Sequence, residues 1–290
     1  MNTYTLLAAT DLSPSSHNTV QRAAMLAQQI SAQLELVHVI EKRELEELQR
    51  LLGETLKENI QSQNQKLLKE LANDIGGSLG ITAGCHLVEG EVLESITKQA
   101  DLLSANLLVI GVRGASLTLQ QLLGSTAERL LRLIQCPVLT VKQPPQRIYQ
   151  KVLVPIDFSP WSIGAINLAQ TVAPQSKLTL LHANDVPFEA QMRIVGEKKK
   201  EIQNYRDKVC QDAKIRLNQV AKDAGLTADW HSLVVNGNAV QKILEQEDEQ
   251  GSDLIIIGRH GYGVVEELLL GSNARQILIH AKCDVLVANR

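Results

Sequence analysis

Two matching stretches decide the fold of this chain, LLVIGVRG at residues 107–114 and LIIIGRHG at residues 254–261. Each begins with four apolar residues in a row, which is typical of a strand buried on both faces of a parallel sheet. Each ends in the pattern Gly-x-x-Gly, and a glycine directly after a strand lets the backbone turn sharply or approach a ligand closely. Because the two stretches lie 147 residues apart, they indicate an internal duplication.

The duplication extends over the whole chain of 290 residues. LLGSTAERLLRLIQCPVLTV at 122–141 matches LLGSNARQILIHAKCDVLVA at 269–288, and LELVHVI at 34–40 matches LTLLHAN at 178–184. The pair Pro144-Pro145 separates the copies, since proline fixes φ and lacks a backbone donor. The sequence therefore predicts a first domain over 1–143, a linker over 144–148 and a second domain over 149–290.

Each copy alternates apolar strands with amphipathic helices. In the first copy we expect strands over 6–10, 34–40, 85–88, 107–110 and 138–141, and helices that begin at Ser13-Pro14 and span 41–74, 91–104 and 126–134. We expect Gly76-Gly77 to end the long second helix. Strands that alternate with helices pair in parallel through right-handed crossovers. The predicted fold class is α/β: two tandem doubly wound domains, each with a five-stranded parallel, Rossmann-like sheet.

The composition excludes several classes of protein. Hydrophobic residues make up 44% and charged residues 21%, which suits packed globular domains. A net charge of −3 argues against a broad nucleic-acid surface, so no nucleic-acid partner is expected. The apolar runs are too short to span a membrane and the N-terminus lacks a signal pattern, which predicts a cytoplasmic protein with no membrane partner. The four cysteines form no CxxC pair, so no protein-ligated metal is expected.

The candidate site follows from where ligands bind in such sheets, beyond the carboxyl ends of the strands. In each copy the Gly-x-x-Gly loop is followed, nine residues later, by a Gly-Ser pair at a predicted helix start, Gly124-Ser125 and Gly271-Ser272. Backbone N–H groups at a helix N-terminus attract anions, and a serine hydroxyl can donate to a phosphate oxygen. The chain contains neither a Walker A lysine nor the G-x-G-x-x-G pattern. The sequence thus predicts a polyphosphate site in each copy.

On these motifs the sequence resembles the universal stress protein family in its tandem two-domain form, over nearly the whole chain. Both copies match the G-2x-G-9x-G-S/T motif of the family's ATP-binding branch. The resemblance implies an adenine nucleotide alpha hydrolase-like fold and ATP, or another adenine nucleotide, in each copy. Because hard cations favour phosphate oxygens and water, we expect Mg²⁺ to bridge the phosphates. It implies two sets of nucleotide-binding residues: Asp11, Val39, Gly111, Gly114, Gly124, Ser125 and Thr126 in the first copy, and Pro155, Asp157, Ala183, Gly258, Gly261, Gly271, Ser272 and Asn273 in the second.

The copies differ in three places near these motifs. Ala9 stands in the first copy where Pro155 stands in the second, which distinguishes the two sites at their adenine ends. Arg113 aligns with His260, so the two loops differ in charge. Asp284 replaces Pro137, a change that we interpret as one of chain geometry away from the phosphate loop.

Several of these residues have a simpler interpretation. The two aspartates after the first strand can be helix N-caps, the strand-two histidines hydrogen-bonded core residues, and the paired cysteines small buried hydrophobes. We interpret the run Lys198-Lys199-Lys200 as a solvated helix face. The long polar segments 41–74 and 189–224 are interpreted as solvent-facing helices, with lids or partner surfaces as the alternative. The aspartates are Asp11 and Asp157, the histidines are His38 and His182, and the cysteines are Cys136 and Cys283.

The resemblance implies a nucleotide-binding regulatory protein of a stress response. No nucleophile–base pair is visible, so no catalytic residue is assigned. Two alternatives stay open: a slow ATPase or nucleotidyl transferase on the same fold, and an interaction module with one vestigial site. The resemblance suggests that the two copies pack as an intramolecular pseudo-dimer through their last strands, and it leaves a further homodimer and the protein partner undecided.

Overall fold

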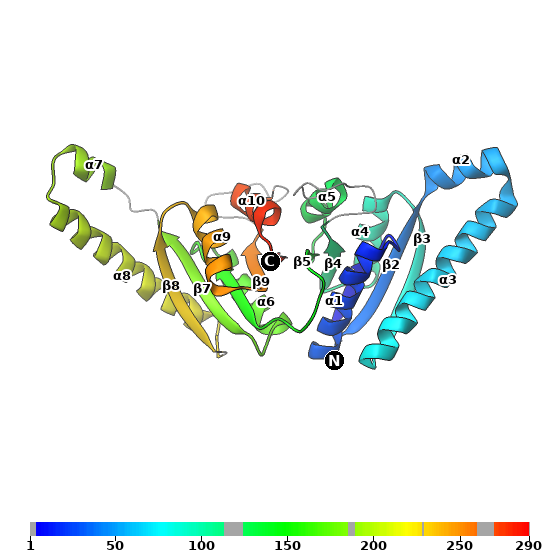
Figure 1. Ribbon diagram of the computed structural model, residues 1–290, viewed down its shortest axis with the longest axis horizontal. Coiled ribbons are helices and arrows are strands. Elements are labelled where there is room, and N and C mark those ends of the chain that lie inside the picture. The colour runs from blue at the N-terminus through cyan, green and yellow to red at the C-terminus, as the bar shows by residue number, and fades with distance from the viewer. Residues whose placement is uncertain (1–3, 113–123, 185–188, 228, 260–269, 290) are drawn as a thin grey trace. The chain divides into compact units, whose positions relative to one another are not determined.

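The computed structural model describes residues 4–112, 124–184, 189–227, 229–259 and 270–289. The chain divides into two compact units, Met1–Ile148 and Tyr149–Arg290 (Figure 1). The predicted residues Gly114 and Gly261, and the differing pair Arg113 and His260, lie outside the described residues.

Unit 1 contains a five-stranded sheet in the order β3-β2-β1-β4-β5, and every pairing between these neighbours is parallel. Right-handed crossovers place α1 and α3, which pack together, on one face, and α4 and α5 on the other. The elements are β1 (Thr5–Ala9), α1 (Pro14–Ile30), β2 (Gln33–Glu41), α2 (Lys42–Leu52), α3 (Glu54–Leu79), β3 (Ala83–Gly90), α4 (Val92–Leu102), β4 (Leu107–Gly111), α5 (Ser125–Leu133) and β5 (Val138–Val141).

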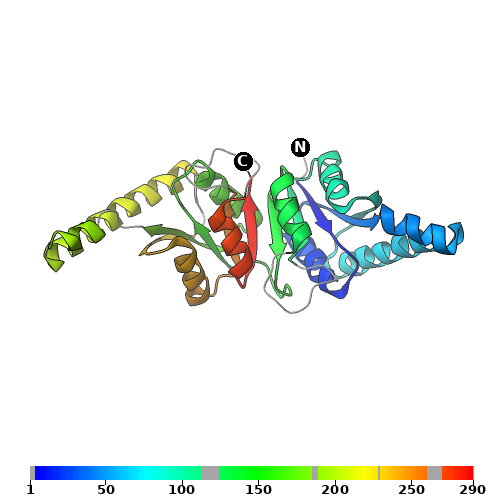
Figure 2. The ribbon, with the colours of Figure 1, turned by 90° about the horizontal axis from the view of Figure 1, so that it is seen from above.

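Unit 2 repeats this connectivity in the order β8-β7-β6-β9-β10, again with parallel pairings. Here α6 packs with α8 and α9 packs with α10, and Figure 2 shows helices on both faces of the sheet within each unit. The predicted α/β class is therefore confirmed. The elements are β6 (Lys151–Pro155), α6 (Trp161–Val172), β7 (Lys177–Asn184), α7 (Glu189–Ile194), α8 (Lys199–Asp223), β8 (Trp230–Asn236), α9 (Ala239–Gln250), β9 (Leu254–Gly258), α10 (Ser272–His280) and β10 (Asp284–Ala288).

The apolar runs that identify the fold form the centre of each unit. Leu107, Leu108 and Val109 of β4 are fully buried, as are Leu254–Ile256 of β9. Both runs are covered from both sides, because helices pack on each face of the sheet. The interpretation of the paired cysteines as buried holds for Cys283, whereas Cys136 is half-buried, although burial still raises the pKa of its thiol to about 11.

The long polar segment of the first copy differs from the prediction. Residues 41–74 were expected to form one helix, but Gly53, at φ +93°, separates α2 from α3. The expectation that Gly76-Gly77 ends the helix is wrong, because α3 runs through both glycines to Leu79 and ends at Gly80, which adopts φ +67°. Gly76 serves packing instead: a Cβ there would lie 2.5 Å from the carbonyl oxygen of Ile81.

This pair of glycines gives a matched prediction. Gly77→Ala should raise the free energy of unfolding by up to about 1 kcal/mol, since alanine favours the helix and its Cβ meets no atom within 4 Å. Gly76→Ala should lower it despite the same gain in helix propensity, because backbone must move to admit the methyl group. Urea unfolding followed by far-UV circular dichroism compares the two variants. Equal shifts in the same direction would contradict the packing role of Gly76.

Candidate functional site

Each unit contains a cavity at the carboxyl ends of its central strands. The cavity of unit 1 has a volume of about 330 Å³ and that of unit 2 about 390 Å³. In unit 1 the chain leaves β1 toward β2 and leaves β4 toward β5 on the opposite side, so strand order reverses between β1 and β4. Such a switch point is where open α/β sheets bind their ligands.

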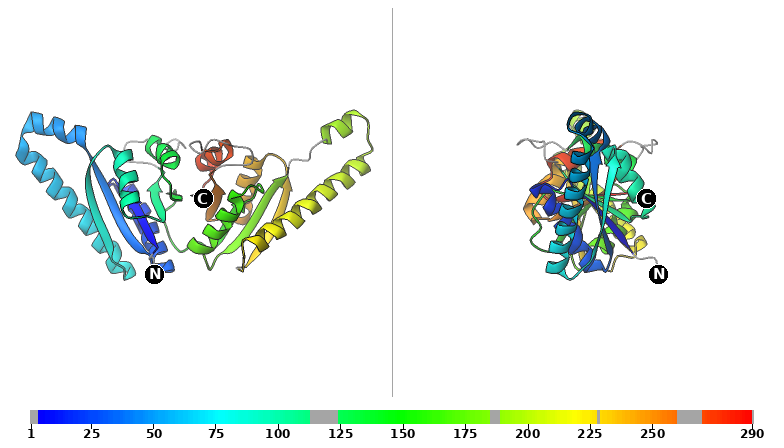
Figure 3. Two further views of the ribbon diagram at one scale, coloured as in Figure 1. Left: turned by 180° about the vertical axis from the view of Figure 1, so that it is seen from behind. Right: turned by 90° about the vertical axis from the view of Figure 1, so that its right-hand side faces the viewer.

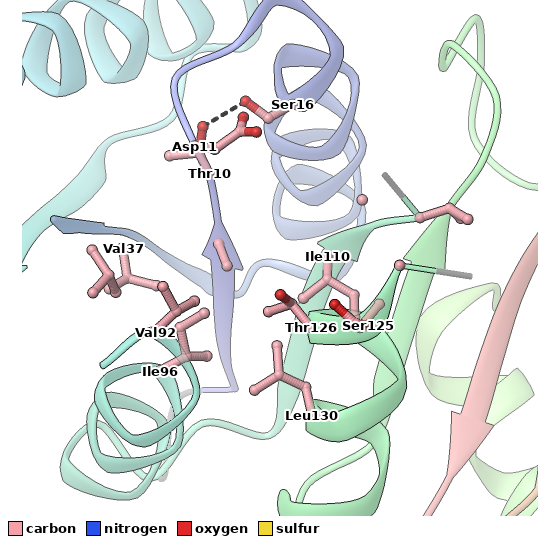
Figure 4. A pocket seen from close by; sticks show the side chains of 16 residues that line it. Thr10, Asp11, Ser16, Val37, Val92, Ile96, Ile110, Ser125, Thr126 and Leu130 are labelled. Atoms are coloured by element: carbon pink, nitrogen blue, oxygen red, sulfur yellow. Dashed lines mark hydrogen bonds between the residues drawn. The ribbon is translucent and has the colours of Figure 1, made fainter. Parts of the chain in front are cut away.

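The structure brings the predicted residues of unit 1 to one cavity. Its lining includes every predicted residue of this unit that the structure describes: Asp11, Val39, Gly111, Gly124, Ser125 and Thr126. Figure 4 shows the aspartate at one end of the cavity and the hydroxyl-bearing residues of the first turn of α5 across from it.

Unit 2 gathers the equivalent residues in the same way. Its cavity is lined by the described members of the predicted set, which are Pro155, Asp157, Ala183, Gly258, Gly271, Ser272 and Asn273. Matching residues of the two copies, which lie more than 140 positions apart in the sequence, thus line the same part of the cavity in each unit, as expected of a duplication.

The start of α5 forms the anion-attracting end of the first cavity. Gly124 is its N-cap, and the first intrahelical bond runs from the N–H of Glu128 to the carbonyl oxygen of Gly124, at 2.9 Å. Helix geometry leaves the N–H groups of residues 125–127 without an intrahelical acceptor, and glycine offers no side chain to cap them. The N–H of Gly124 donates to the carbonyl of Val112 at 3.1 Å, which ties this helix start to the end of β4.

The second unit repeats this arrangement. Gly271 is the N-cap of α10, its carbonyl accepts from the N–H of Arg275 at 2.9 Å, and its N–H donates to the carbonyl of Arg259 at 3.0 Å. In both units the positive end of a helix dipole therefore faces the cavity beside a Ser hydroxyl, an arrangement that attracts phosphate.

The two aspartates organise the turn after the first strand. Asp11 Oδ1 accepts from the N–H of Ser13 at 3.0 Å and from its hydroxyl at 2.5 Å. Asp157 Oδ1 accepts from the N–H of Ser159 at 2.9 Å and from the hydroxyl of Ser162 at 3.1 Å. The interpretation of these aspartates as N-caps is wrong: Ser13 caps α1 and Pro160 occupies the N-cap position of α6.

The strand-two histidines connect the first two strands of each sheet. Nδ1 of His38 donates to the carbonyl of Thr10 at 2.8 Å, and Nδ1 of His182 donates to the carbonyl of Ile156 at 2.7 Å. Both histidines are hydrogen-bonded, as interpreted, but they are half-buried rather than core residues. Because each imidazole fixes the end of its strand, the backbone of the next residue, Val39 or Ala183, is held at the cavity wall.

His182 also lines the second cavity, a role that the sequence did not reveal. The centre of its ring lies 4.4 Å from the centre of the Phe158 ring. The guanidinium carbon of Arg216 on α8 lies 3.9 Å from the centre of the Phe158 ring. Burial is the main cause that lowers the pKa of His182 below its ordinary value of 6.5, and Arg216 adds to it. The imidazole at this site is consequently neutral at pH 7.

This pKa shift predicts a pH dependence of stability. The unfolded chain binds a proton at His182 near pH 6.5, but the folded chain does so only at lower pH. As pH falls through that window, unfolding takes up a proton and the free energy of unfolding decreases; above the window the full contribution is present. His182→Gln should flatten this part of the profile relative to the wild type. Urea midpoints between pH 5 and pH 7.5 test this, and a variant whose midpoints fall with pH as steeply as those of the wild type would contradict it.

Apolar side chains from a separate helix complete each cavity. Val92 and Ile96 of α4 lie across from Ile110 and Leu130 in the first cavity (Figure 4). Ala239 and Ile243 of α9 take the equivalent place in the second. An apolar slot of this kind suits a flat aromatic base. Sequence reasoning missed these residues because their helical spacing predicts only a buried helix face.

The two cavities differ at the residue before the aspartate. In unit 1 the buried hydroxyl of Thr10 lies 2.8 Å from that of Ser16 and accepts from the N–H of Leu12 at 3.0 Å (Figure 4). The Ser16 hydroxyl donates to the carbonyl of Ser13, so the Thr10 hydroxyl supplies the proton between them. Ile156 stands at this place in unit 2, which makes that wall apolar.

A resident metal would need ligands beyond the chain itself. Within the described ranges, no group of three or more His, Cys, Asp or Glu side chains is arranged to hold a metal ion. The donors at these cavities, hydroxyls and helix N–H groups, suit an anion. A Mg²⁺ ion here would therefore be held by phosphate oxygens and water.

The duplicated fold and the paired cavities define a class, that of tandem doubly wound α/β proteins with a ligand cavity at the switch point of each sheet. The chain belongs to the universal stress protein family, whose sequence profile matches residues 3–142 and 148–289.

Members of this family match the chain both over one of its copies and over nearly its whole length. Universal stress protein A homolog 1 of Coxiella burnetii is 34% identical over 139 residues, which cover 47% of this chain and 94% of that protein. Homolog 2 of the same organism is 44% identical over 84 residues, which cover 56% of that protein. Universal stress protein MT2052 of Mycobacterium tuberculosis is 26% identical over 308 residues, covering 98% of this chain and 94% of its own.

The fold itself is matched by a solved structure. The crystal structure of a universal stress protein from Archaeoglobus fulgidus aligns over 100% of both chains with a TM-score of 0.72 and 22% identity. None of the helices in the part of the chain that the structure describes is both long and apolar enough to cross a membrane.

Proposed function

We propose that each unit binds one adenine nucleotide, ATP with Mg²⁺, and that the chain acts as a nucleotide-binding regulatory protein of a stress response. The observation that carries this proposal is the recurrence, in both units, of one cavity lined by the aspartate after the first strand and by the Gly-Ser helix start after the fourth.

The ends of each cavity suit different parts of a nucleotide. The apolar slot between α4 and α5, or between α9 and α10, would take the adenine ring, next to the backbone of Val39 or Ala183. The helix start at Ser125 or Ser272 would take the phosphates through N–H groups and the serine hydroxyl. The volumes, about 330 and 390 Å³, are within the usual range of about 300–1,000 Å³ for small-molecule sites.

A regulatory role is supported by what lines the cavities. Their described residues include no lysine and no nucleophile hydrogen-bonded to a histidine, and both cavity aspartates already accept bonds from neighbouring serines. Hydrolysis would have to rely on a bound metal and water. A ligand that is held without being converted can shift a conformational equilibrium, which is the basis of a sensor.

Three measurements test the proposal. Mass spectrometry of small molecules released on denaturing the purified protein identifies the bound nucleotide and its molar ratio. Titration calorimetry with ATP and Mg²⁺, and with GTP as the control, should give two sites for ATP per chain. Release of inorganic phosphate distinguishes a sensor from an ATPase. An absence of adenine nucleotide in the first experiment together with no heat in the second would overturn the proposal.

A further inference from the structure

Each unit has a helical arm, formed by α2 and α3 in unit 1 and by α7 and α8 in unit 2, and the turns at the outer ends of the two arms carry the same short motif. Residues 50–54 read RLLGE and residues 193–197 read RIVGE. In each motif a glycine with positive φ, Gly53 at +93° or Gly196 at +78°, follows the first helix and turns the chain toward the second. Figure 3 shows these turns, between α2 and α3 and between α7 and α8, at the ends of arms that extend beyond the edge of each unit's own sheet.

Both turns expose a pair of aliphatic side chains. Leu51 and Leu52 are each 64% exposed, Ile194 is 83% exposed and Val195 is 74% exposed. These four account for half of the eight large hydrophobic residues that are exposed in the described part of the chain. A single exposed aliphatic residue needs no explanation, but two adjacent ones at the end of an arm form an apolar tip, and the charge around each tip decides what it can contact.

Charge separates the two turns. Residues 189–206 of unit 2 contain five basic and three acidic residues, a net charge of +2 in a chain whose total is −3. Aligned on the shared motif, residues 46–63 of unit 1 contain two basic and four acidic residues, a net charge of −2. The excess at the second turn comes from Lys198, Lys199 and Lys200, which are all exposed.

These lysines occupy an unfavourable place for folding. Lys198 is the N-cap of α8 and the other two are its first residues, where the positive end of the helix dipole repels cations. The nearby Glu189 is bound by Arg193 at 2.6 Å and by Arg206 at 2.5 Å, so its charge is already compensated. Among the residues that the structure describes, no ion pair involves the three lysines, which makes a role outside the fold the better explanation.

We propose that the unit 2 tip, defined as Ile194, Val195 and Lys198–Lys200, docks on the surface of an anionic phospholipid bilayer. The two aliphatic side chains enter the boundary between headgroups and acyl chains, and the lysines pair with lipid phosphates. This contact is peripheral. The expectation of no membrane partner depended on hydropathy, which tests for spanning segments and says nothing about such a tip.

The shape of the tip favours a bilayer over a protein partner. A stable protein interface buries about 800 Å² on each side and needs a complementary surface, and two aliphatic side chains at the end of an arm supply only a small part of that. A bilayer accepts a projecting tip without a preformed groove, and its negative charge complements the lysines.

Vesicle sedimentation of the full-length protein tests the proposal. Binding is expected to vesicles of phosphatidylcholine with phosphatidylserine, to weaken with salt, and to be absent with phosphatidylcholine alone. The triple variant K198Q/K199Q/K200Q should bind about 100-fold more weakly, since each lysine near an anionic surface is worth about fivefold. I194S/V195S should bind at least about tenfold more weakly because its aliphatic anchor is lost.

The first turn supplies the matched control, since L51S/L52S removes the same kind of aliphatic pair from an acidic arm and should leave binding unchanged. Circular dichroism confirms that each variant is folded. The proposal would be overturned if the wild type did not bind phosphatidylserine vesicles, or if the two serine pairs weakened binding equally. It would also be overturned if the protein bound a duplex DNA oligonucleotide as tightly as vesicles, through the lysines and without any effect of I194S/V195S.

Discussion

Gly124→Val is expected to remove one of two bound nucleotides per chain, and Gly271→Val the other. Both glycines have backbone angles that any residue adopts, with φ −59° and ψ 144° at Gly124 and φ −55° and ψ 144° at Gly271. The helix start should therefore persist in the variants. The branched side chain would instead stand at the cavity wall, where it separates a phosphate from the N–H groups of the first turn.

If the valine side chain prevents two N–H groups of the first turn from donating to the phosphate, two charge-assisted hydrogen bonds are lost. This loss weakens nucleotide binding by about 3 kcal/mol or more, which is over 100-fold. Titration calorimetry with ATP and Mg²⁺ should show the stoichiometry fall from two to one in each single variant and to zero in the double variant. Ser125→Ala, which removes only one hydroxyl donor, is the milder control and should keep both sites. An unchanged stoichiometry in folded glycine variants would contradict the site assignment.

Gly84→Ala should lower the free energy of unfolding of unit 1. Gly84 of β3 lies opposite Glu35 of β2, and a Cβ at this position would be 1.7 Å from the Glu35 carboxylate. That carboxylate is buried and accepts from Nε2 of His86 at 2.7 Å and from the amide of Gln33. To admit the methyl group, the Glu35 side chain must turn its carboxylate away from one or both of these partners, which costs about 1–3 kcal/mol.

The second copy shows how this cost can be relieved. There the corresponding pair is Thr179 opposite His231, so a smaller polar residue on the second strand allows a side chain on the third. The double variant G84A/E35T should therefore be more stable than G84A alone. Far-UV circular dichroism in urea is the suitable measurement, because both tryptophans, Trp161 and Trp230, lie in unit 2 and do not report on unit 1. A wild-type midpoint for G84A would contradict the close contact.

The sequence was most informative where one local pattern determines one local structure. Unbroken apolar runs predicted the strands, and Ser13 before Pro14 predicted the start of α1, where the Ser13 hydroxyl accepts from the N–H of Ser16 at 3.3 Å. The Gly-Ser pairs were correctly placed at helix starts. In each case the deciding interactions lie within a few residues along the chain.

Predictions failed where the deciding neighbour is distant in sequence. The role of Gly76 depends on the loop at Ile81, and the role of Asp284 on Tyr149. Asp284 was interpreted as a change in chain geometry, but it is buried and accepts a hydrogen bond of 2.6 Å from the hydroxyl of Tyr149, which is also buried. No local pattern could have paired residues that are 135 positions apart.

The sequence by itself determined that the chain contains two copies of a doubly wound α/β domain, since duplication and apolar periodicity can be read along one dimension. It also selected most of the polar cavity residues, because the motif glycines and aspartates follow directly after strands. Only the tertiary structure decided which apolar residues of α4 and α9 close the cavities, that His182 lines one of them, and that aliphatic pairs are exposed at the ends of the arms. The physical reason is that burial and contact depend on the packing of distant elements, which a spacing of residues does not encode.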